Sequence, residues 1–210
     1  MADKEARPFI LISMILSLFG FWIHPVLGVL GFICIVAVMA FFRDPERSIP
    51  DDPLAIVSSA DGTVISVEEK EDPHYQNGRM LRIAVFLSVL DVHVNRSPVE
   101  GEVLEMHHHA GEFLDARHQE VDIRNEAMNW HLATPNGNVV VRQIAGLIAR
   151  RIVAWQKVGS PLQKGQRIGM IRFGSRTDIY LPLDCQACVE KGQKVKGGET
   201  IIAMWPEPSS

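Results

Sequence analysis

The stretch Arg167-Ile-Gly-Met-Ile-Arg-Phe-Gly-Ser-Arg-Thr-Asp-Ile-Tyr-Leu-Pro182 places a Gly174-Ser175 step between two short runs of β-like character. Gly and Ser dominate turns for backbone reasons, so the ordinary interpretation of such a step is a turn. A serine hydroxyl can also attack the carbonyl carbon of the residue before it. The Gly174-Ser175 bond is therefore a candidate for cleavage by its own serine. Other motifs in the sequence are needed to distinguish this interpretation from an ordinary turn.

Composition describes a folded protein. The chain has 210 residues, of which 47% are hydrophobic and 22% charged, which is typical of a domain that forms a core and is not typical of a disordered segment. Its formal net charge is -4. A protein that binds nucleic acid broadly needs clustered excess Lys and Arg, so nucleic acid is not an expected partner.

The N-terminal region differs sharply from the rest of the chain. Residues 9–23 and 26–42 are two uncharged apolar runs, separated by His24-Pro25. As helices they would rise about 22 and 25 Å, each short for a hydrocarbon core of about 30 Å. One continuous helix would reach about 51 Å and would be broken at the proline. The pattern predicts a helical hairpin that spans the membrane or is re-entrant.

Basic residues flank this hairpin at both outer ends. Lys4 and Arg7 precede it, and Arg43 and Arg47 follow it. The positive-inside rule then places both ends, and the domain that follows, on the cytoplasmic side of a cell membrane. A cleaved signal peptide is the alternative, suggested by Ala37-Val-Met-Ala40, but its apolar region normally has only about 7 to 15 residues. We expect residues 1–47 to be a membrane-anchoring hairpin with its junction, and residues 48–210 to be a separate folded domain.

Beyond residue 50 the pattern is that of short strands punctuated by Gly, Asn and Pro. The predicted fold class is mainly β (α+β). Residues 158–169 weakly resemble residues 189–200, and this spacing of glycines and aliphatic residues is typical of lipoyl- and biotinyl-like β-sandwiches, although a carrier's modified lysine beside methionine is missing. The predicted strands cover residues 55–58, 62–67, 82–87, 101–106, 121–125, 130–134, 139–144, 151–155, 167–171, 178–181 and 200–205, with a helical turn or a bent strand at 144–151.

Two patterns invite a metal interpretation. Cys185 and Cys188 form a single C-x-x-C, but a zinc site needs two further ligands, and residues 189–210 contain neither Cys nor His. Redox or zinc chemistry therefore stays the minor alternative to two ordinary strand residues near a turn. In the His107–His109 tract, alternate side chains of a strand diverge, so this tract is not expected to bind metal either.

Six short motifs follow one another along the chain in an order that is informative when they are considered together. Their order and spacing over almost the whole chain resemble the short, membrane-anchored (archaeal-type) class of phosphatidylserine decarboxylase proenzymes. The residues that carry this resemblance are Phe42-Arg-Asp-Pro-Glu-Arg47, Ser59-Ala-Asp-Gly-Thr63, Phe86-Leu-Ser-Val-Leu-Asp-Val-His-Val-Asn-Arg-Ser-Pro98, Gly111-Glu-Phe113, Arg124-Asn-Glu126 and Arg172-Phe-Gly-Ser175.

The resemblance implies self-cleavage between Gly174 and Ser175, giving chains 1–174 and 175–210 from a catalytic domain at residues 48–210. Ser175 Oγ would attack the Gly174 carbonyl to give an ester, β-elimination would leave dehydroalanine, and hydrolysis would release ammonia and leave a pyruvoyl group. This covalent cofactor would condense with the amine of phosphatidylserine and act as electron sink for loss of CO2, yielding phosphatidylethanolamine. No added cofactor and no metal are implied.

A serine hydroxyl needs a base to become a good nucleophile. The resemblance matches Asp61 to an aspartate that orients a histidine during self-cleavage, with a simple turn aspartate before Gly62 as the alternative. Relatives carry two histidines where this chain has His93 and Arg96, so we expect His93 to take the role of base and later of proton donor. Asp91 and His93, two residues apart, would face the same side if they lie on a strand.

The implied partners are phosphatidylserine, the lipid membrane, and the two cleavage chains themselves, which would stay associated. The oligomeric state, including a homo-oligomer, stays open. Two other functions are weighed against this one. A pyruvoyl decarboxylase of a soluble amino acid would not need the apolar hairpin. A non-catalytic, membrane-tethered β-sandwich adaptor would remain one uncut chain.

Overall fold

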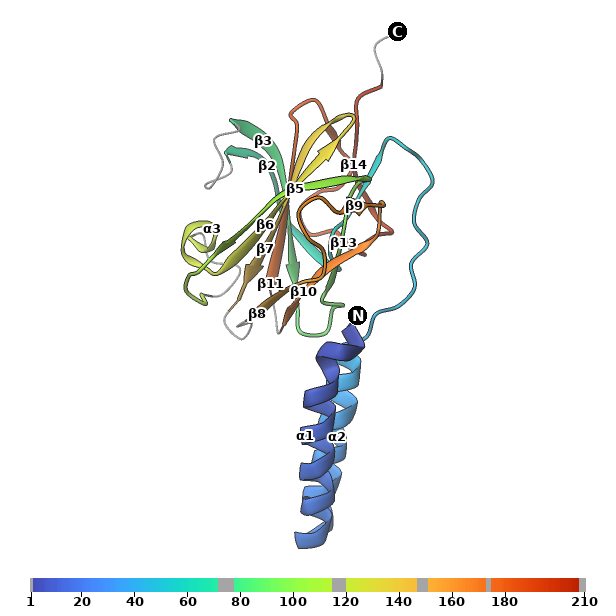
Figure 1. The fold of residues 1–210 in the computed structure, drawn as a ribbon, viewed down its shortest axis with the longest axis vertical. Coiled ribbons are helices and arrows are strands. Elements are labelled where there is room, and N and C mark those ends of the chain that lie inside the picture. The colour runs from blue at the N-terminus through green and yellow to red at the C-terminus, as the bar shows by residue number, and fades with distance from the viewer. Residues whose placement is uncertain (1, 72–77, 115–119, 147–150, 173–174, 208–210) are drawn as a thin grey trace. The chain divides into compact units, whose positions relative to one another are not determined.

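The computed structural model describes residues 2–71, 78–114, 120–146, 151–172 and 175–207 (Figure 1). The chain divides into two compact units, Met1–Pro45 and Glu46–Ser210. The first is helical and the second is built almost wholly from strands. Each unit is described by itself.

The first unit is a helical hairpin of α1 (Ala2–Ile23) and α2 (Pro25–Phe41), which lie side by side in Figure 1. His24 caps α2, because its Nδ1 accepts a hydrogen bond from the Val26 N–H at 3.2 Å, and Pro25 occupies the first turn, where no N–H is needed. The helices approach closely where small residues face each other. Ser17 Oγ donates to the Gly28 carbonyl at 2.9 Å.

The predicted hairpin is thus confirmed as a pair of helices. With 22 residues, α1 is longer than the apolar run itself and rises about 33 Å. By length and composition it is able to cross a membrane, whereas α2 has only 17 residues.

The second unit contains an eight-stranded antiparallel sheet and two sheets of three strands. The large sheet has the order β13-β2-β3-β11-β7-β6-β5-β9, and the small ones are β1-β14-β12 and β4-β10-β8. The strand bounds are β1 Ala55–Val57, β2 Gly62–Glu71, β3 Arg79–Leu87, β4 Val94–Arg96, β5 Gly101–His109, β6 Ala127–Thr134, β7 Gly137–Ala145, β8 Arg151–Ala154, β9 Pro161–Leu162, β10 Arg167–Arg172, β11 Ser175–Leu181, β12 Gln186–Ala187, β13 Lys194–Val195 and β14 Ile201–Met204.

The main hydrophobic core lies on one face of the large sheet. Ile83, Trp130, Val141 and Ile179 come from four of its strands and are fully buried, and Ile202 of β14 packs into the same cluster. Alternate residues of each strand enter this core, as the period of two requires. The prediction of a mainly β fold behind an apolar helical hairpin is confirmed.

One predicted strand is wrong. Residues 121–125 form the short helix α3 (Val121–Arg124) instead of a strand. The helix is favoured because Arg124 pairs with Glu120 one turn earlier, at 2.7 Å, and Asp122 stands in the first turn, where a negative charge is stabilised. The short strands β4, β9, β12 and β13 were not predicted from the sequence. Part of the predicted turn or bent strand at 144–151 lies outside the described residues.

Candidate functional site

Ser175 is the first residue of β11, the strand at the middle of the large sheet. Its backbone is paired with Leu87 of β3 on one side and with Ala145 of β7 on the other. The strand before it, β10, belongs to a different sheet and pairs with β4 and β8. The strands on either side of the Gly174-Ser175 step therefore do not form a hairpin with each other. Gly174 itself lies outside the described residues.

His93 is a fully buried residue just before β4. Its backbone carbonyl accepts from the Ile171 N–H at 3.3 Å, so the histidine lies beside the end of β10. Ile171 is four residues before Ser175 in the chain. The ring atom Nδ1 lies 2.9 Å from the carbonyl oxygen of Asp91. A carbonyl can only accept, so Nδ1 carries the proton and, in the neutral ring, Nε2 carries the lone pair.

Asp91 closes the turn that joins β3 to His93. Its Oδ2 accepts from the Ser88 N–H at 2.8 Å and from Ser88 Oγ at 2.6 Å, and its own N–H donates to the Ser88 carbonyl at 3.0 Å. Residues 91–93 are not part of a strand, so the expected same-side arrangement of the two side chains is not found. Asp91 meets His93 through its backbone, whereas its carboxylate faces Ser88.

Asp61 stands at the start of β2, one strand beyond β3. Its carboxylate accepts from Arg47 Nη2 with both oxygens, at 3.0 and 2.9 Å, and from the Gly197 N–H at 2.8 Å. Within the described part of the chain, these hydrogen bonds go to an arginine and a backbone amide rather than to a histidine. The side chains of Arg47 and Asp61 are only 6% and 15% exposed, so this is a largely buried ion pair.

Backbone pairings nevertheless bring the four predicted residues to one end of the large sheet. Ser175 pairs with Leu87, at the end of β3, and the turn holding Asp91 follows immediately. Thr63, two residues after Asp61, pairs with Phe86. The end of β3 is thus the shared neighbour of all four segments.

A chain of buried polar side chains connects β11 to this end of the sheet. Asn95 Nδ2 donates to Thr177 Oγ1 at 3.2 Å and to the Ser59 carbonyl at 3.4 Å, and Asn95 Oδ1 accepts from Gln143 at 2.6 Å. Gln143 in turn accepts from the Trp130 indole at 2.7 Å. All five residues are fully buried. Such a network fixes the backbone of β4 against β11, because a buried polar group left without a partner is costly.

Comparison with known proteins identifies the family. The model of the phosphatidylserine decarboxylase family matches residues 36–203. A phosphatidylserine decarboxylase proenzyme of Symbiobacterium thermophilum is 44% identical over 205 residues, covering 97% of this chain and 95% of the relative. One from Carboxydothermus hydrogenoformans is 46% identical over 187 residues, covering 89% and 86%, and one from Burkholderia ambifaria is 44% identical over 206 residues, covering 95% and 94%. The chain belongs to the phosphatidylserine decarboxylase family.

Arg96 is the residue that, by the resemblance described above, stands where a second histidine is expected in the decarboxylase family. Arg96 is buried, and its Nη1 donates to the Gly165 carbonyl at 3.1 Å while its N–H donates to the Ser59 carbonyl at 2.8 Å. A guanidinium in this place is a structural hydrogen-bond donor and cannot serve as a base at neutral pH.

Sequence reasoning missed a cluster of buried charges on the other side of the decarboxylase sheet. Arg176, next to Ser175, donates to Asp178 at 2.6 and 2.5 Å and also bonds Asp122 of α3. Arg82 donates to Asp122 at 3.0 Å and to Asp178 at 3.3 Å, and Lys70 also pairs with Asp122. The signal was present as charged residues at alternate positions 176 and 178 of a β-like run, but that pattern ordinarily indicates a solvated face.

The charges in this cluster stabilise one another. Burial alone would raise the pKa of the Asp122 carboxyl, but Arg176, Lys70 and Arg82 outweigh it and hold that pKa below its usual value. Burial alone would likewise lower the pKa of Arg176, but Asp178 and Asp122 raise it above its usual value. Asp122 and Arg176 are therefore both charged at neutral pH. The start of β11 is held by ion pairs immediately after the Gly174-Ser175 step.

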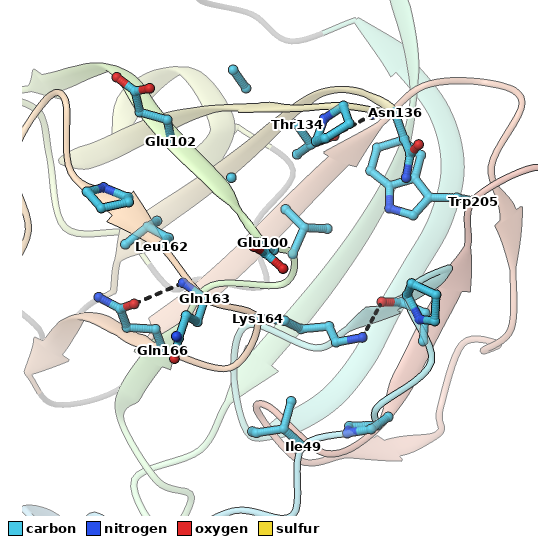
Figure 2. Close-up of a pocket in the computed structure, with 18 of the residues that line it drawn as sticks. Ile49, Glu100, Glu102, Thr134, Asn136, Leu162, Gln163, Lys164, Gln166 and Trp205 are labelled. Carbon is cyan, nitrogen blue, oxygen red and sulfur yellow. Dashed lines mark hydrogen bonds between the residues drawn. The ribbon is translucent and has the colours of Figure 1, made fainter.

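The pocket drawn in Figure 2 lies away from the end of the sheet that holds Ser175. It has a volume of about 1100 Å³ and is lined at the start of β5 by Glu102, at the end of β6 by Thr134, and by Lys164 and Trp205. Thr134 pairs with Gly137 at the turn of the β6–β7 hairpin, whereas Ala145, the partner of Ser175, is at its other end. Eight residues of strand separate these ends, about 26 Å. Hence this pocket is not where the predicted catalytic residues gather.

Proposed function

We propose that this chain is a self-cleaving, pyruvoyl-dependent phosphatidylserine decarboxylase that produces phosphatidylethanolamine and CO2. The observation that carries the proposal is the position of Ser175 as the first residue of a central strand, with buried His93 beside the preceding strand, in a chain 44% identical to phosphatidylserine decarboxylase proenzymes. The proposed catalytic domain is residues 48–210, cut between Gly174 and Ser175.

The strand pairing supports stable association of the two proposed products, 1–174 and 175–210. The smaller would contribute β11, which pairs on both sides with strands of the larger. It would also contribute β13, paired with β2, and β14, paired with β1. Ion pairs from Arg176 to Asp122 and from Asp178 to Arg82 would join the products as well. Cutting one bond would therefore leave the fold held by several ladders.

The proposed cleavage needs a base for the Ser175 hydroxyl. His93 suits that role, because its Nδ1–H is committed to the Asp91 carbonyl and its Nε2 therefore carries the lone pair in the neutral ring. The proton taken from Oγ would reside on Nε2 while Oγ attacks the Gly174 carbonyl carbon and the C–N bond breaks. The freed Ser175 amine accepts a proton, and an ester joins the two residues. Loss of the Cα proton of residue 175 to a base then breaks the Cβ–O ester bond, so that the Gly174 carboxylate leaves and dehydroalanine remains. Water replaces the nitrogen of its imine form, which releases ammonia and leaves the pyruvoyl carbonyl.

One buried hydroxyl belongs to the segment that Asn95 links to Thr177 of β11, and we propose it as a donor to a carbonyl group at position 175. Ser59 Oγ is buried and, among the described residues, has no hydrogen-bond partner, so it can donate to an added acceptor. Asn95 and Thr177 fix the neighbouring backbone. When formed, a pyruvoyl group supplies an electron-withdrawing carbonyl for the decarboxylation of an amino acid head group. His93, once protonated, would be the donor that returns a proton to the substrate α-carbon.

A phospholipid substrate would stay in a membrane while only its head group enters the site. The apolar helix α1, long enough to cross a bilayer, supports an anchor for the same membrane. In the proposal the second unit then works at the cytoplasmic surface, which agrees with basic residues at both ends of the hairpin.

The intact mass of the purified protein under denaturing conditions tests this function. We expect two masses, for residues 1–174 and 175–210, with the smaller short by the mass of one ammonia and alone reactive with phenylhydrazine. Ser175→Ala should give only the full-length chain, because no Oγ remains to attack. A single unreactive wild-type chain that releases no CO2 from phosphatidylserine would overturn the proposal and would favour the adaptor. Normal two-chain processing of Ser175→Ala would refute the assigned cleavage site.

A further inference from the structure

The turn from Ser88 to Asp91 exposes two neighbouring apolar side chains. Val89 is 49% exposed and Leu90 is 82% exposed, although the residues on either side, Leu87 and Val92, are buried. A single apolar residue on a surface needs no explanation. This turn, however, lies next to the candidate site, because Leu87 pairs with Ser175 and His93 follows two residues after Asp91.

The turn is held firmly to the site. Both the N–H and the hydroxyl of Ser88 donate to the Asp91 carboxylate, at 2.8 and 2.6 Å. The Asp91 carbonyl in turn meets His93 Nδ1 at 2.9 Å. Whatever surface Val89 and Leu90 touch is therefore fixed in position relative to the His93 ring.

One lysine stands beside the turn, and a second follows it two residues later in the chain. Lys194 Nζ lies 3.9 Å from Asp91 Oδ1, and the side chain of Lys194 is 70% exposed. Lys196, two residues further, is 68% exposed and also approaches Glu199 at 3.6 Å. The Lys194 to Lys196 segment is fixed at this end of the sheet, because Lys194 pairs with Thr63. Acidic Asp91 and Glu199 moderate this charge, but the long exposed side chains are the basic ones.

An apolar tip with a lysine beside it fits one kind of partner best. Apolar side chains gain by leaving water for the acyl region of a bilayer, and Lys near the surface is attracted by anionic head groups. We propose that the Ser88–Asp91 turn is a membrane-contacting wedge, in which Val89 and Leu90 insert into an anionic phospholipid surface and Lys194 lies at the level of the phosphates. The wedge would bring the His93 end of the second unit to the bilayer from which a lipid head group enters.

The kinetic consequence of this wedge rests on the proposed decarboxylase function, but membrane contact itself does not. Membrane contact is separated from decarboxylase function by measuring contact in a Ser175→Ala chain, because this measurement needs no enzyme activity. In a Cys34→Ser/Cys188→Ser background, Leu90→Cys would carry an environment-sensitive nitrobenzoxadiazole label in the full-length protein, reconstituted in vesicles. The matched control is Leu183→Cys, since Leu183 is 51% exposed just beyond the opposite end of β11.

We expect the label at position 90 to shift to the blue and to be quenched by nitroxide-bearing lipids in vesicles that contain phosphatidylserine. The effect should be weaker in vesicles of phosphatidylcholine alone, and the label at position 183 should respond to neither. A label at 90 that stays water-exposed in both vesicles overturns the proposal. So does a blue shift without quenching by the lipid nitroxide, which would indicate a protein partner.

Activity provides a second readout. In reconstituted vesicles Val89→Ser/Leu90→Ser should raise the apparent KM for phosphatidylserine about tenfold, the loss of about 1.4 kcal/mol of binding free energy, with kcat kept. Self-cleavage and turnover of a short-chain, monomeric phosphatidylserine should match wild type, as should Leu183→Ser throughout. Equal losses on both substrates would overturn the wedge, because the turn would then act on site geometry. Quenching at position 90 without any decarboxylation by the wild-type protein would refute the decarboxylase function and leave the wedge standing.

Discussion

The guanidinium of Arg47 donates to both carboxylate oxygens of Asp61, at 3.0 and 2.9 Å, and the pair is largely buried. Asp61 thus has a structural partner in addition to any part in self-cleavage. The proposed role of Asp61 in processing can be separated from its role in the fold by replacing each partner in turn. Replacing either residue removes the ion pair, but only replacing Asp61 removes the carboxylate.

We expect Asp61→Asn and Arg47→Gln each to lower the free energy of unfolding by about 3 kcal/mol, since each leaves a buried partner uncompensated. Asp61→Asn should in addition slow self-cleavage, whereas Arg47→Gln should still be processed. Urea denaturation in the Ser175→Ala background, in which every variant stays in one piece in the proposed mechanism, measures the first effect. The fraction of full-length chain with time, with Ser175 present, measures the second. If Arg47→Gln is processed as slowly as Asp61→Asn, the carboxylate acts only through its ion pair. Asp51→Asn, at an exposed position, is the control.

His93 carries the second prediction. Its Nδ1 is bound to the Asp91 carbonyl, so the ring presents Nε2 as the base. His93→Gln keeps a polar side chain of similar size but has no basic nitrogen, and we expect self-cleavage to slow by about 100-fold or more. A time course of full-length and cleaved chains on denaturing gels measures this, with exposed His107→Gln as control. Cleavage of His93→Gln at the wild-type rate would restrict His93 to the decarboxylation step.

Local patterns predicted most of the fold, and they failed where tertiary contacts decide. The apolar runs around His24-Pro25 predicted two helices, and the alternating pattern beyond residue 50 predicted a strand-rich domain; the structure contains both. Residues 121–125 alternate apolar and polar over so short a run that helix and strand cannot be told apart by period. The choice of helix brings Asp122 onto Arg82 and Arg176, a contact between segments 40 and 54 residues apart in sequence.

The candidate site was predictable as a set of motifs but not as a set of contacts. No local pattern indicates that Asp61 meets Arg47, or that the Asp91 carboxylate faces Ser88. Charged residues on a strand are ordinarily exposed, so the burial of Asp178 and Arg142 could not be foreseen without the covering helix α3. The motif order identifies the family, and only the fold shows which partners hold each residue.

The buried carboxylate of Asp122 gives a prediction about stability. Asp122→Asn should lower the free energy of unfolding by about 3 kcal/mol or more near neutral pH, because Arg176 and Arg82 lose a buried counter-charge. Urea denaturation of the Ser175→Ala chain, which stays in one piece in the proposed mechanism, is the measurement. Asp184→Asn, at an exposed position, should have little effect. An Asp122→Asn chain as stable as its parent would contradict the ion-pair interpretation.

The same carboxylate predicts a pH dependence. The pKa of Asp122 is held below its usual value in the folded state, whereas in the unfolded chain it lies near about 3.9. The stabilisation from this group is therefore present above about pH 4 and is lost as the pH falls from there through the folded pKa. The difference in unfolding free energy between the parent chain and Asp122→Asn should shrink between about pH 5 and about pH 2. A difference that is constant over this range would mean that ionisation of Asp122 does not stabilise the fold.

The C-x-x-C pair gives the last prediction. Cys185 is buried, and burial, with a smaller effect of Asp184, raises the pKa of its thiol to about 12. At about pH 8 only about one molecule in ten thousand would then hold the reactive thiolate. Cys188 is exposed, so iodoacetamide should modify Cys188 in the native protein and reach Cys185 only after denaturation, as peptide mass spectrometry can show. A disulfide or a metal bound by both sulfurs would protect the two alike, so equal protection of Cys188 would restore the redox or zinc interpretation. Equal labelling of both residues in the native protein would instead contradict the burial of Cys185.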